Sequence, residues 1–365
     1  MSIAIINAFL ILMLGYVYWR MPDAVHPTLP FGVRIPPHRA GDTAIAHVKR
    51  IYRTILVVLA AVGILAVWLL RSVETVYVAL LPVAFIIIVY LDYYGAHRSL
   101  QAVKERGGWY EGQREAAVVD TNARIAPRRY PTGLLLIAIA VILITAAIGV
   151  ARYPQLPTIL ATHFGQNGQP NGWMQKTPLS AFLLIWMQIG LTAIFAVIGY
   201  VLLQTRQELD PSAPEASAAR HQAFQIAMVR VLLVLGILMN ATFLLSSLQI
   251  WGIKLFGNGP RAVIVVLPVL IGVAYTFFVT LRIGQGGSRL PQPAEKPTGY
   301  VHRDDDRYWL FGRIYVNRDD RAIFVQKRFG IGWTLNFGHP VSWVALVMIV
   351  VLALSPTFLH AMAHR

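Results

Sequence analysis

Residues 54–94 read TILVVLAAVGILAVWLLRSVETVYVALLPVAFIIIVYLDYY, two apolar runs separated by a short turn at Arg71, Ser72 and Glu74. An α-helix rises 1.5 Å per residue, so about 20 apolar residues cross the roughly 30 Å of hydrocarbon in a bilayer. The runs at 54–70 and 74–94 have this length. We therefore expect a helical hairpin that crosses a membrane twice.

Six further apolar segments extend this pattern toward both ends of the chain, at 3–19, 132–151, 179–203, 225–249, 261–282 and 340–360. Charged residues make up only 13% of the chain, against about 25% in soluble proteins. The expected fold is an all-α polytopic membrane protein with about eight transmembrane helices and a small cytoplasmic three-stranded β-meander between helices 7 and 8. The chain has no cysteine, which excludes disulfides, iron–sulfur clusters and cysteine nucleophiles.

The positions of the basic residues predict the orientation. Of the 32 Lys and Arg residues, 25 lie in the alternate loops 20–53, 95–131, 204–224 and 282–339. Cytoplasmic loops of membrane proteins collect Lys and Arg, so these loops are predicted to be cytoplasmic and both termini to lie outside. The first apolar segment is predicted to be a retained span, because its positive charge follows it rather than precedes it. We expect a plasma (inner) membrane protein whose net charge of +15 reflects these loops rather than nucleic-acid binding.

Four segments are expected along the chain: a three-helix unit at 1–131, a four-helix unit at 132–283, a cytoplasmic linker and meander at 284–339, and a final helix at 340–365. Two charged residues fall inside spans, Asp92 near the end of the third and Arg230 within the sixth. Both lie near the predicted inner interface, where side chains reach water or lipid phosphates. An ion pair or snorkelling is favoured over a transport site, because neither residue is near mid-membrane.

The predicted outside loop 156–177 reads LPTILATHFGQNGQPNGWMQKT. It contains two Asn-Gly pairs, 167–168 and 171–172, which suit turns that need positive φ. One interpretation is a compact cap whose Trp173 packs at the membrane interface. The alternative is a loop that recognises a ligand. The candidate recognition residues are His163, Asn167, Gly168, Pro170, Asn171, Gly172, Trp173 and Lys176.

This loop, with the pattern Pro-Thr-x-x-x-Thr-His-Phe followed by Gly-x-Pro-x-Gly-Trp-x-x-Lys-Thr, resembles the signature of a bacterial membrane domain of unknown function, number 1648. The domain is shared with the Sdp immunity proteins, which protect cells from a secreted toxic peptide and signal through a small repressor. The resemblance implies an immunity or sensor role for the six signature positions His163, Gly168, Pro170, Gly172, Trp173 and Lys176. The second, C-terminal domain of the immunity proteins is not recognisable here.

The loop 282–339 contains aromatic and β-branched runs separated by Asn, Asp and Gly, the pattern of a small sheet. A three-stranded meander is too small to be stable alone, so it should pack on the membrane face or on loop 20–53. Its acidic run at 304–306 is interpreted as ion-paired with nearby arginines rather than as a metal site. The stretch resembles the domain of unknown function number 5808. The candidate residues for a cytoplasmic interaction are Asp304, Asp305, Tyr308, Trp309, Tyr315, Asn317, Asp320, Lys327, Arg328, Trp333 and Asn336.

The histidines offer one weak metal candidate. His360 and His364 are four residues apart at the end of the last helix, on the same predicted side of the membrane as His163. Three histidines suit zinc, but no acidic residue is in evident reach. A surface pair and no metal are therefore expected.

Three functions are compatible with the sequence. The leading hypothesis is a non-enzymatic membrane sensor or immunity-type protein, whose outside loop recognises a ligand and whose cytoplasmic segment contacts a partner. The alternative is a transporter or exporter of a small solute or peptide, with Asp92 and Arg230 along the path. The third hypothesis is a membrane-embedded enzyme. The sequence contains neither a His-Glu-x-x-His nor a Gly-x-Ser-x-Gly motif to support it. The expected partners are the lipid bilayer, an extracellular peptide or envelope ligand and a cytoplasmic regulator, with no cofactor and no nucleic acid.

Overall fold

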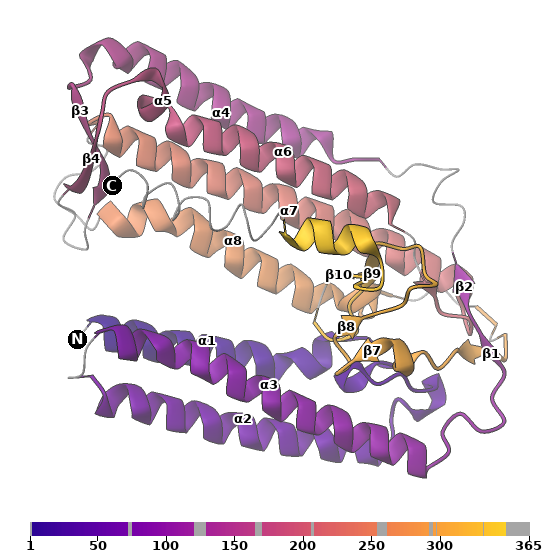
Figure 1. The fold of residues 1–365 in the computed structure, drawn as a ribbon. Coiled ribbons are helices and arrows are strands. Elements are labelled where there is room, and N and C mark those ends of the chain that lie inside the picture. Colours follow the sequence, from indigo (N-terminus) through magenta and orange to yellow (C-terminus); the bar gives the residue numbers. More distant parts are fainter. Residues whose placement is uncertain are drawn as a thin grey trace. The chain divides into compact units, whose positions relative to one another are not determined.

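In the part of the chain that the structure describes, seven helices are long and apolar enough to cross a membrane (Figure 1). The computed structural model describes residues 2–71, 75–119, 129–164, 170–205, 208–253, 261–291, 295–296, 298–330 and 332–347. The seven helices are α1 (Ser2–Ala24), α2 (Thr43–Leu69), α3 (Thr75–Arg106), α4 (Thr132–Arg152), α6 (Leu183–Gln204), α7 (Pro214–Ile250) and α8 (Arg261–Ile283). The predicted multi-pass helical fold is confirmed for these seven. A helix also begins at residue 340 and runs to 347, and the rest of the eighth predicted span lies outside the described residues.

Three helices continue well past their apolar segments. Helix α2 begins 11 residues before residue 54, α3 ends 12 residues after residue 94, and α7 begins 11 residues before residue 225. Each extension adds about 16–18 Å of helix. At the start of α2, the side chain of Asp42 accepts a hydrogen bond from the backbone N–H of Ala44 at 2.9 Å and so caps the helix.

The described chain forms two compact units that do not follow sequence order. Unit 1 comprises residues 1–120, 206–221 and 283–365, and unit 2 comprises residues 121–205 and 222–282. The C-terminal segment therefore belongs with the N-terminal helices. Helix α7 continues from unit 1, at its first residues, into unit 2.

In unit 1, α1, α2 and α3 run side by side (Figure 1). Their buried side chains recur at helical spacing, as at Ile45, Val48, Tyr52 and Leu56 on α2. The core continues beyond the helices into the loop that follows α1, because Phe31 is fully buried with Tyr52.

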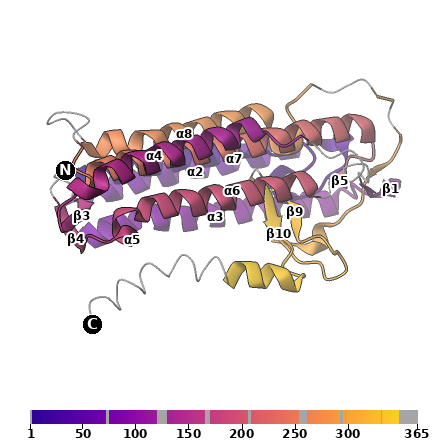
Figure 2. The ribbon, with the colours of Figure 1, turned by 90° about the horizontal axis from the view of Figure 1, so that it is seen from above.

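The C-terminal segment of unit 1 forms short strand pairs. Strand β7 (Trp309–Leu310) pairs antiparallel with β8 (Ile314–Tyr315), and β9 (Phe324–Gln326) with β10 (Trp333–Leu335) (Figure 2). A single parallel bridge joins Tyr315 to Asn336. The strands are thus two hairpins and one bridge, instead of the continuous three-stranded meander that the sequence predicts. Two further pairs, β1 (Glu115–Ala116) with β6 (Val301–His302) and β2 (Val118–Val119) with β5 (Glu208–Leu209), tie the loop after α3 to distant segments.

The side chain of Asn336 explains why the strands stop. Its Nδ2 donates to the backbone oxygens of Asn317 at 2.8 Å and Asp320 at 2.9 Å, and its Oδ1 accepts from the backbone N–H of Asn317 at 3.0 Å. These bonds satisfy backbone groups that a longer ladder would otherwise pair.

Unit 2 contains α4, α6, most of α7, α8 and the hairpin of β3 (Ile159–Phe164) and β4 (Pro170–Gln175). A short helix, α5 (Pro178–Ala181), leads from the hairpin into α6. At the hairpin end, α4 comes close to Trp251, because a Cβ on Gly149 would lie 2.7 Å from the Trp251 ring. Only a glycine allows this approach.

Candidate functional site

The signature loop is a β-hairpin. Its register pairs Ile159 with Gln175, Ala161 with Trp173 and His163 with Gly172, with irregularities on either side of His163. Residues 165–169, which include the candidates Asn167 and Gly168, lie outside the described residues. The described part is therefore the hairpin's stem. The pair Asn171-Gly172 lies within strand β4, where Gly172 is paired with His163 and is not among the residues with positive φ, so it does not form the turn that its sequence suggests.

Lys176 lies at the base of the hairpin and has an internal role. Its Nζ donates to the backbone oxygen of Leu156 at 2.9 Å and lies 4.7 Å from the centre of the Tyr153 ring. Its backbone N–H donates to the oxygen of Thr158 at 2.8 Å. Lys176 thus joins the end of β4 to the chain just before β3, because Leu156 lies between the end of α4 at Arg152 and the start of β3 at Ile159.

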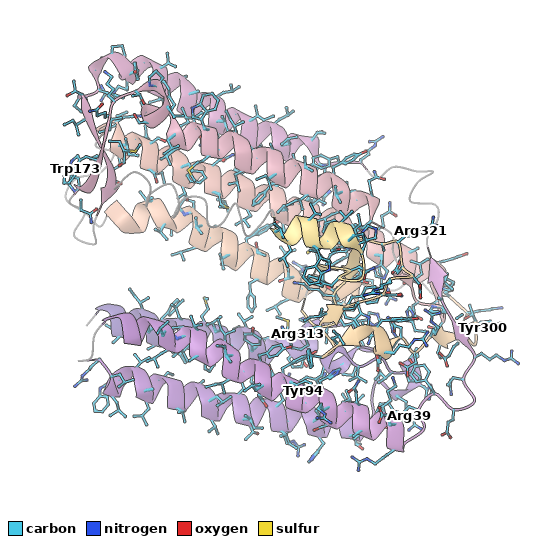
Figure 3. The ribbon with its side chains drawn as sticks, viewed as in Figure 1. Arg39, Tyr94, Trp173, Tyr300, Arg313 and Arg321 are labelled. Atoms are coloured by element: carbon cyan, nitrogen blue, oxygen red, sulfur yellow. The ribbon has the colours of Figure 1, made fainter. Side chains whose placement is uncertain are left out.

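Trp173, in contrast to Lys176, is largely exposed. Its side chain is 58% exposed on β4 (Figure 3). Met174 and Ile159 beside it are also exposed. An exposed tryptophan between other apolar side chains suits either a membrane interface or a ligand surface. Trp173 is the aromatic signature residue on the described stem, and it has a large free surface.

The hairpin is held on the helices by a small core. Leu160 is fully buried and packs with Ile185 of α6 and Leu248 of α7. The indole N–H of Trp251, just after α7, donates to the backbone oxygen of Ala181 at 3.0 Å. The hairpin base, the start of α6 and the end of α7 therefore form one packed cluster.

A polar cluster lies among the helices of unit 2. The Nε2 of Gln188 donates to Thr145 Oγ1 at 3.2 Å and to the backbone oxygen of Asn240 at 2.9 Å. The Nδ2 of Asn240 donates to Thr192 Oγ1 at 2.9 Å. All four side chains are buried. The side-chain oxygens of Gln188 and Asn240 accept no hydrogen bond from any residue that the structure describes. A buried oxygen in this state calls for a water or another donor.

The two charged span residues differ in environment. Arg230 is exposed on α7 in unit 2. Asp92 is half-buried on α3 in unit 1, and within the described chain its Oδ2 has no hydrogen-bond partner. Their pairing stays a prediction.

The acidic run of unit 1 is held by cations from distant parts of the chain. Arg34 donates from Nε to Asp305 at 2.5 Å, and Lys104 lies 2.7 Å from Asp304 and 2.6 Å from Asp306. Arg328 pairs with both Asp305 and Asp306. Among the described residues, this acidic run therefore forms ion pairs with Arg34, Lys104 and Arg328, and not with the neighbouring arginines that the sequence suggests.

Arg328 is the centre of this arrangement. Its side chain is 1% exposed, and besides the two carboxylates it donates to the backbone oxygen of Gly32 at 3.0 Å. The guanidinium also lies 4.9 Å from the centre of the Trp309 ring. A buried guanidinium needs acceptors for its N–H groups and negative partners for its charge, because an unpaired buried charge is costly.

The charges of the cluster set the ionisation of Asp306. Burial alone would raise the pKa of Asp306, but Arg328 and Lys104 outweigh burial and hold the pKa below its usual value. The backbone N–H of Arg34 also donates to this carboxylate at 3.0 Å. Asp306 is therefore ionised at neutral pH.

Aromatic packing completes the contact between the C-terminal segment and the N-terminal helices. The ring of Phe329 lies 4.1 Å from Tyr93 of α3 and stacks on Phe31 at 6.4 Å. The Tyr93 hydroxyl donates to the backbone oxygen of Phe31 at 2.9 Å. The guanidinium of Arg313 lies over the rings of Tyr93 and Phe329. We call this whole contact, with the acidic cluster, the cap contact.

The remaining candidate interaction residues mostly make contacts inside unit 1. Tyr315 donates to Asp320 at 3.1 Å and accepts from Asn317, and the backbone oxygen of Lys327 accepts from Gln285 at 3.0 Å. Trp309 is buried against Tyr315, and Trp333 pairs with Gln326 in the β9–β10 hairpin. Binding of a separate partner by these residues stays a prediction.

Sequence reasoning did not single out Arg34 and Lys104 for the acidic run. The usable signal was local: Arg34 follows Phe31-Gly32 and precedes Pro36-Pro37, an unusual context for a charge that faces only solvent. Phe31 has a φ of 49° and Gly32 a φ of 76°. A bulky residue in the left-handed region is held there only by surrounding packing.

Of the three histidine candidates, the structure describes only His163. His163 is on β3 of unit 2, whereas His360 and His364 lie outside the described residues. Within the described ranges, no group of three His, Cys, Asp or Glu residues is placed to hold a metal ion.

Comparison with known families gives two matches. Residues 140–189 match the domain of unknown function DUF1648, and residues 318–343 match the family of unknown function DUF5808. Both agree with the resemblances found in the sequence. The first match spans the second half of α4, the hairpin, α5 and the start of α6, and the second spans β9 and β10. No curated protein and no solved structure showed a match. The chain is a multi-pass membrane protein that carries these two domains of unknown function.

Proposed function

We propose that the protein is a membrane sensor of the immunity type. In this proposal the β3–β4 hairpin meets an extracellular peptide or envelope ligand, and the C-terminal segment passes the signal to a cytoplasmic regulator. The orientation rests on the distribution of Lys and Arg between alternate loops.

The observation that carries the proposal is the continuity of α7. One end of this 37-residue helix leads into Trp251, which closes the cluster beneath the hairpin. At its other end, the backbone N–H of Ala216 donates to the Glu295 carboxylate at 2.8 Å, and the Ser217 hydroxyl accepts from the backbone N–H of Asp210 at 2.9 Å. A single helix thus contacts the signature hairpin and the segment that leads to the DUF5808 region. A tilt or shift of such a helix is a common way to couple two faces of a membrane.

The exposed apolar surface of the hairpin supports ligand recognition. Trp173, Met174 and Ile159 are each more than 40% exposed, whereas Lys176 is used internally. By the strand alternation, Trp173 and Ile159 share one face of the hairpin, whereas Met174 shares the opposite face with the buried Leu160. We therefore expect Trp173 and Ile159 to contact the ligand and Lys176 to maintain the hairpin.

The test is complementation of a deletion strain, with survival under secreted toxic peptides as the readout. The complementing copies are the wild type, the double variant Trp173→Ala/Ile159→Ala, and Leu179→Ala. Leu179 is the matched control, because it is 68% exposed on α5 but off the hairpin. We expect the wild type and Leu179→Ala to restore survival and the double variant to fail while reaching the membrane in equal amount.

Equal rescue by all three copies, or a deletion strain with wild-type survival, would remove the basis for the proposal. Lys176→Met is a useful fourth copy: we expect it to lose the hairpin's base contact, and therefore to lower the thermal stability as well as survival.

Transport of a small solute is the second candidate, and one observation favours it. The oxygens of Gln188 and Asn240 are buried in a membrane unit, and the described residues leave both without a donor, an arrangement that suits a water or a small cation. Flux of potassium or sodium into proteoliposomes tests it. A flux that disappears in Gln188→Leu would favour transport over sensing, and no flux in the wild type would remove this candidate.

A further inference from the structure

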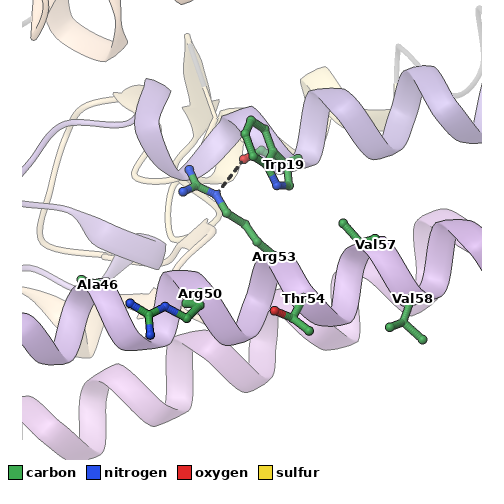
Figure 4. Close-up of a pocket in the computed structure, with 7 residues that line it drawn as sticks. All are labelled: Trp19, Ala46, Arg50, Arg53, Thr54, Val57 and Val58. Carbon is green, nitrogen blue, oxygen red and sulfur yellow. Dashed lines mark hydrogen bonds between the residues drawn. The ribbon is translucent and has the colours of Figure 1, made fainter.

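A surface groove of about 490 Å³ runs over α1 and α2 of unit 1 (Figure 4). It is lined by Trp19 from α1 and by Arg50, Arg53, Thr54, Val57 and Val58 from α2. Counted from Arg50, the other α2 residues lie at positions i+3, i+4, i+7 and i+8, so they share one face of the helix.

The groove crosses the boundary between charged and apolar sequence. Arg50 and Arg53 are the last charges before the apolar run of α2, and Val57 and Val58 belong to that run. From Arg50 to Val57 the helix rises about 10 Å. In a bilayer this distance leads from the headgroup phosphates to the first part of the acyl chains.

The basic part of the groove has more cations than anions. Asp23 is 2.5 Å from Arg53, 3.5 Å from Lys49 and 3.9 Å from Arg20, so three cations share one carboxylate. Arg50 makes no ion pair with any residue that the structure describes. The chain therefore leaves positive charge here that an external anion can neutralise.

Arg53 is already fixed in position. Its Nε donates to the backbone oxygen of Trp19 at 3.4 Å, and its guanidinium lies 4.8 Å from the centre of the Trp19 ring (Figure 4). A guanidinium that is held in this way loses little entropy when it binds a phosphate, and its Nη1 makes no hydrogen bond to any residue that the structure describes, so it can donate to a phosphate oxygen.

The other half of the groove is apolar and open. Val57 and Val58 are 59% and 55% exposed on a membrane-spanning helix. We propose that the groove is a binding site for an anionic phospholipid, with the phosphate at Arg50 and Arg53 and one acyl chain over Trp19, Val57 and Val58. This site is independent of the proposed sensor function.

The test is lipid titration into the delipidated full-length protein in detergent, with bound lipid counted by native mass spectrometry. Phosphatidylglycerol and phosphatidylcholine of equal chain length are the probes. We expect phosphatidylglycerol to bind more tightly, and Arg50→Gln to weaken it about fivefold, because each basic residue near anionic lipid contributes about that factor. Arg98→Gln is the matched control, because Arg98 is an exposed arginine on α3 of the same unit.

The apolar half has its own variant. We expect Val58→Asn to weaken phosphatidylglycerol binding and to leave the affinity for soluble glycerol phosphate unchanged. Equal binding of the two lipids, unchanged binding in Arg50→Gln, or an equal loss in Arg98→Gln would overturn the proposal, the last because it would show only general charge attraction.

Discussion

Arg328 joins the C-terminal segment of unit 1 to the loop after α1 in the cap contact. It binds Asp305, Asp306 and the backbone of Gly32, and it is almost fully buried. Replacing a buried ion pair with apolar groups can be neutral, but removing one partner leaves the other charge unpaired and is strongly destabilising. The residue-scale predictions concern this asymmetry.

We expect Arg328→Met to destabilise the cap contact by about 3 kcal/mol, because Asp305 and Asp306 keep only part of their positive partners. Hydrogen exchange of the backbone amides of 324–336 measures this, and protection should fall on the order of 100-fold. Arg321→Met is the control: Arg321 is an exposed arginine of the same segment, so protection in this variant should match the wild type (Figure 3). Equal protection in both variants would mean that the buried cluster does not hold the segment.

Asp306 makes the stability of the cap contact depend on pH. Because the folded pKa of Asp306 lies below its unfolded value of 3.8, its ionisation stabilises the fold above that value, and the contribution is lost as pH falls through the folded pKa. We expect Asp306→Asn to lower the thermal midpoint by a constant amount between pH 5 and 8, corresponding to about 2 kcal/mol. Below about pH 4 the two midpoints should converge. A difference that grows on acidification would contradict the assignment of the charged form.

At the scale of elements, close helix packing and helix length set what the hairpin and the cap can contact. The hairpin depends on the packing of α4 against Trp251, which Gly149 permits. The cap depends on the extension of α3 beyond its apolar segment, because Lys104 lies in that extension. A helix that ended at residue 94 would not bring Lys104 to the acidic run.

Gly149→Ala should loosen the base of the hairpin. The added Cβ would lie 2.7 Å from the Trp251 ring and 3.0 Å from Phe182, so we expect a loss of about 1–3 kcal/mol from overpacking. Thermal unfolding in detergent measures this. Gly190→Ala on α6 is the control, because a Cβ added there would have no described neighbour within 4 Å, and its midpoint should not fall. A fall of equal size in both would indicate a general effect of helix glycines.

At the scale of the whole molecule, each compact unit is built from segments that are not consecutive in the chain. The C-terminal segment returns to the N-terminal helices, while the DUF1648 region lies in unit 2. Helix α7 belongs to both units, and a sensor of the proposed kind needs such an element to join its two faces.

The two faces can be tested directly, because the chain has no cysteine and every introduced one is unique. Trp173→Cys and Tyr300→Cys place a thiol at residues that are 58% and 44% exposed (Figure 3). We expect a membrane-impermeant maleimide to label the first in intact cells and the second only after permeabilisation. Labelling in the reverse order would invert the predicted orientation, and with it the roles of the hairpin and the C-terminal segment.

Much of the architecture follows from local sequence. The seven spans are apolar runs of about 20 residues, and the length of such a run is a property of the chain itself. The aromatic and β-branched runs of 309–335 likewise indicated strands, and two short motifs indicated the domain resemblances. The number of strand pairs did not follow, because the side chain of Asn336 replaces part of the expected ladder.

What only the tertiary structure decided is which side chains meet. Arg34 pairs with Asp305 across 271 positions of the chain, and Lys176 is used inside the hairpin although its residue type suggested ligand binding. Membrane insertion depends on the summed hydrophobicity of consecutive residues, so it can be read from sequence. An ion pair forms only when two charged groups lie within a few ångströms of each other, and residues distant in sequence reach this separation only through folding. The spans were therefore determined by sequence, and the partners of Asp304, Asp305 and Asp306 by the folding of unit 1.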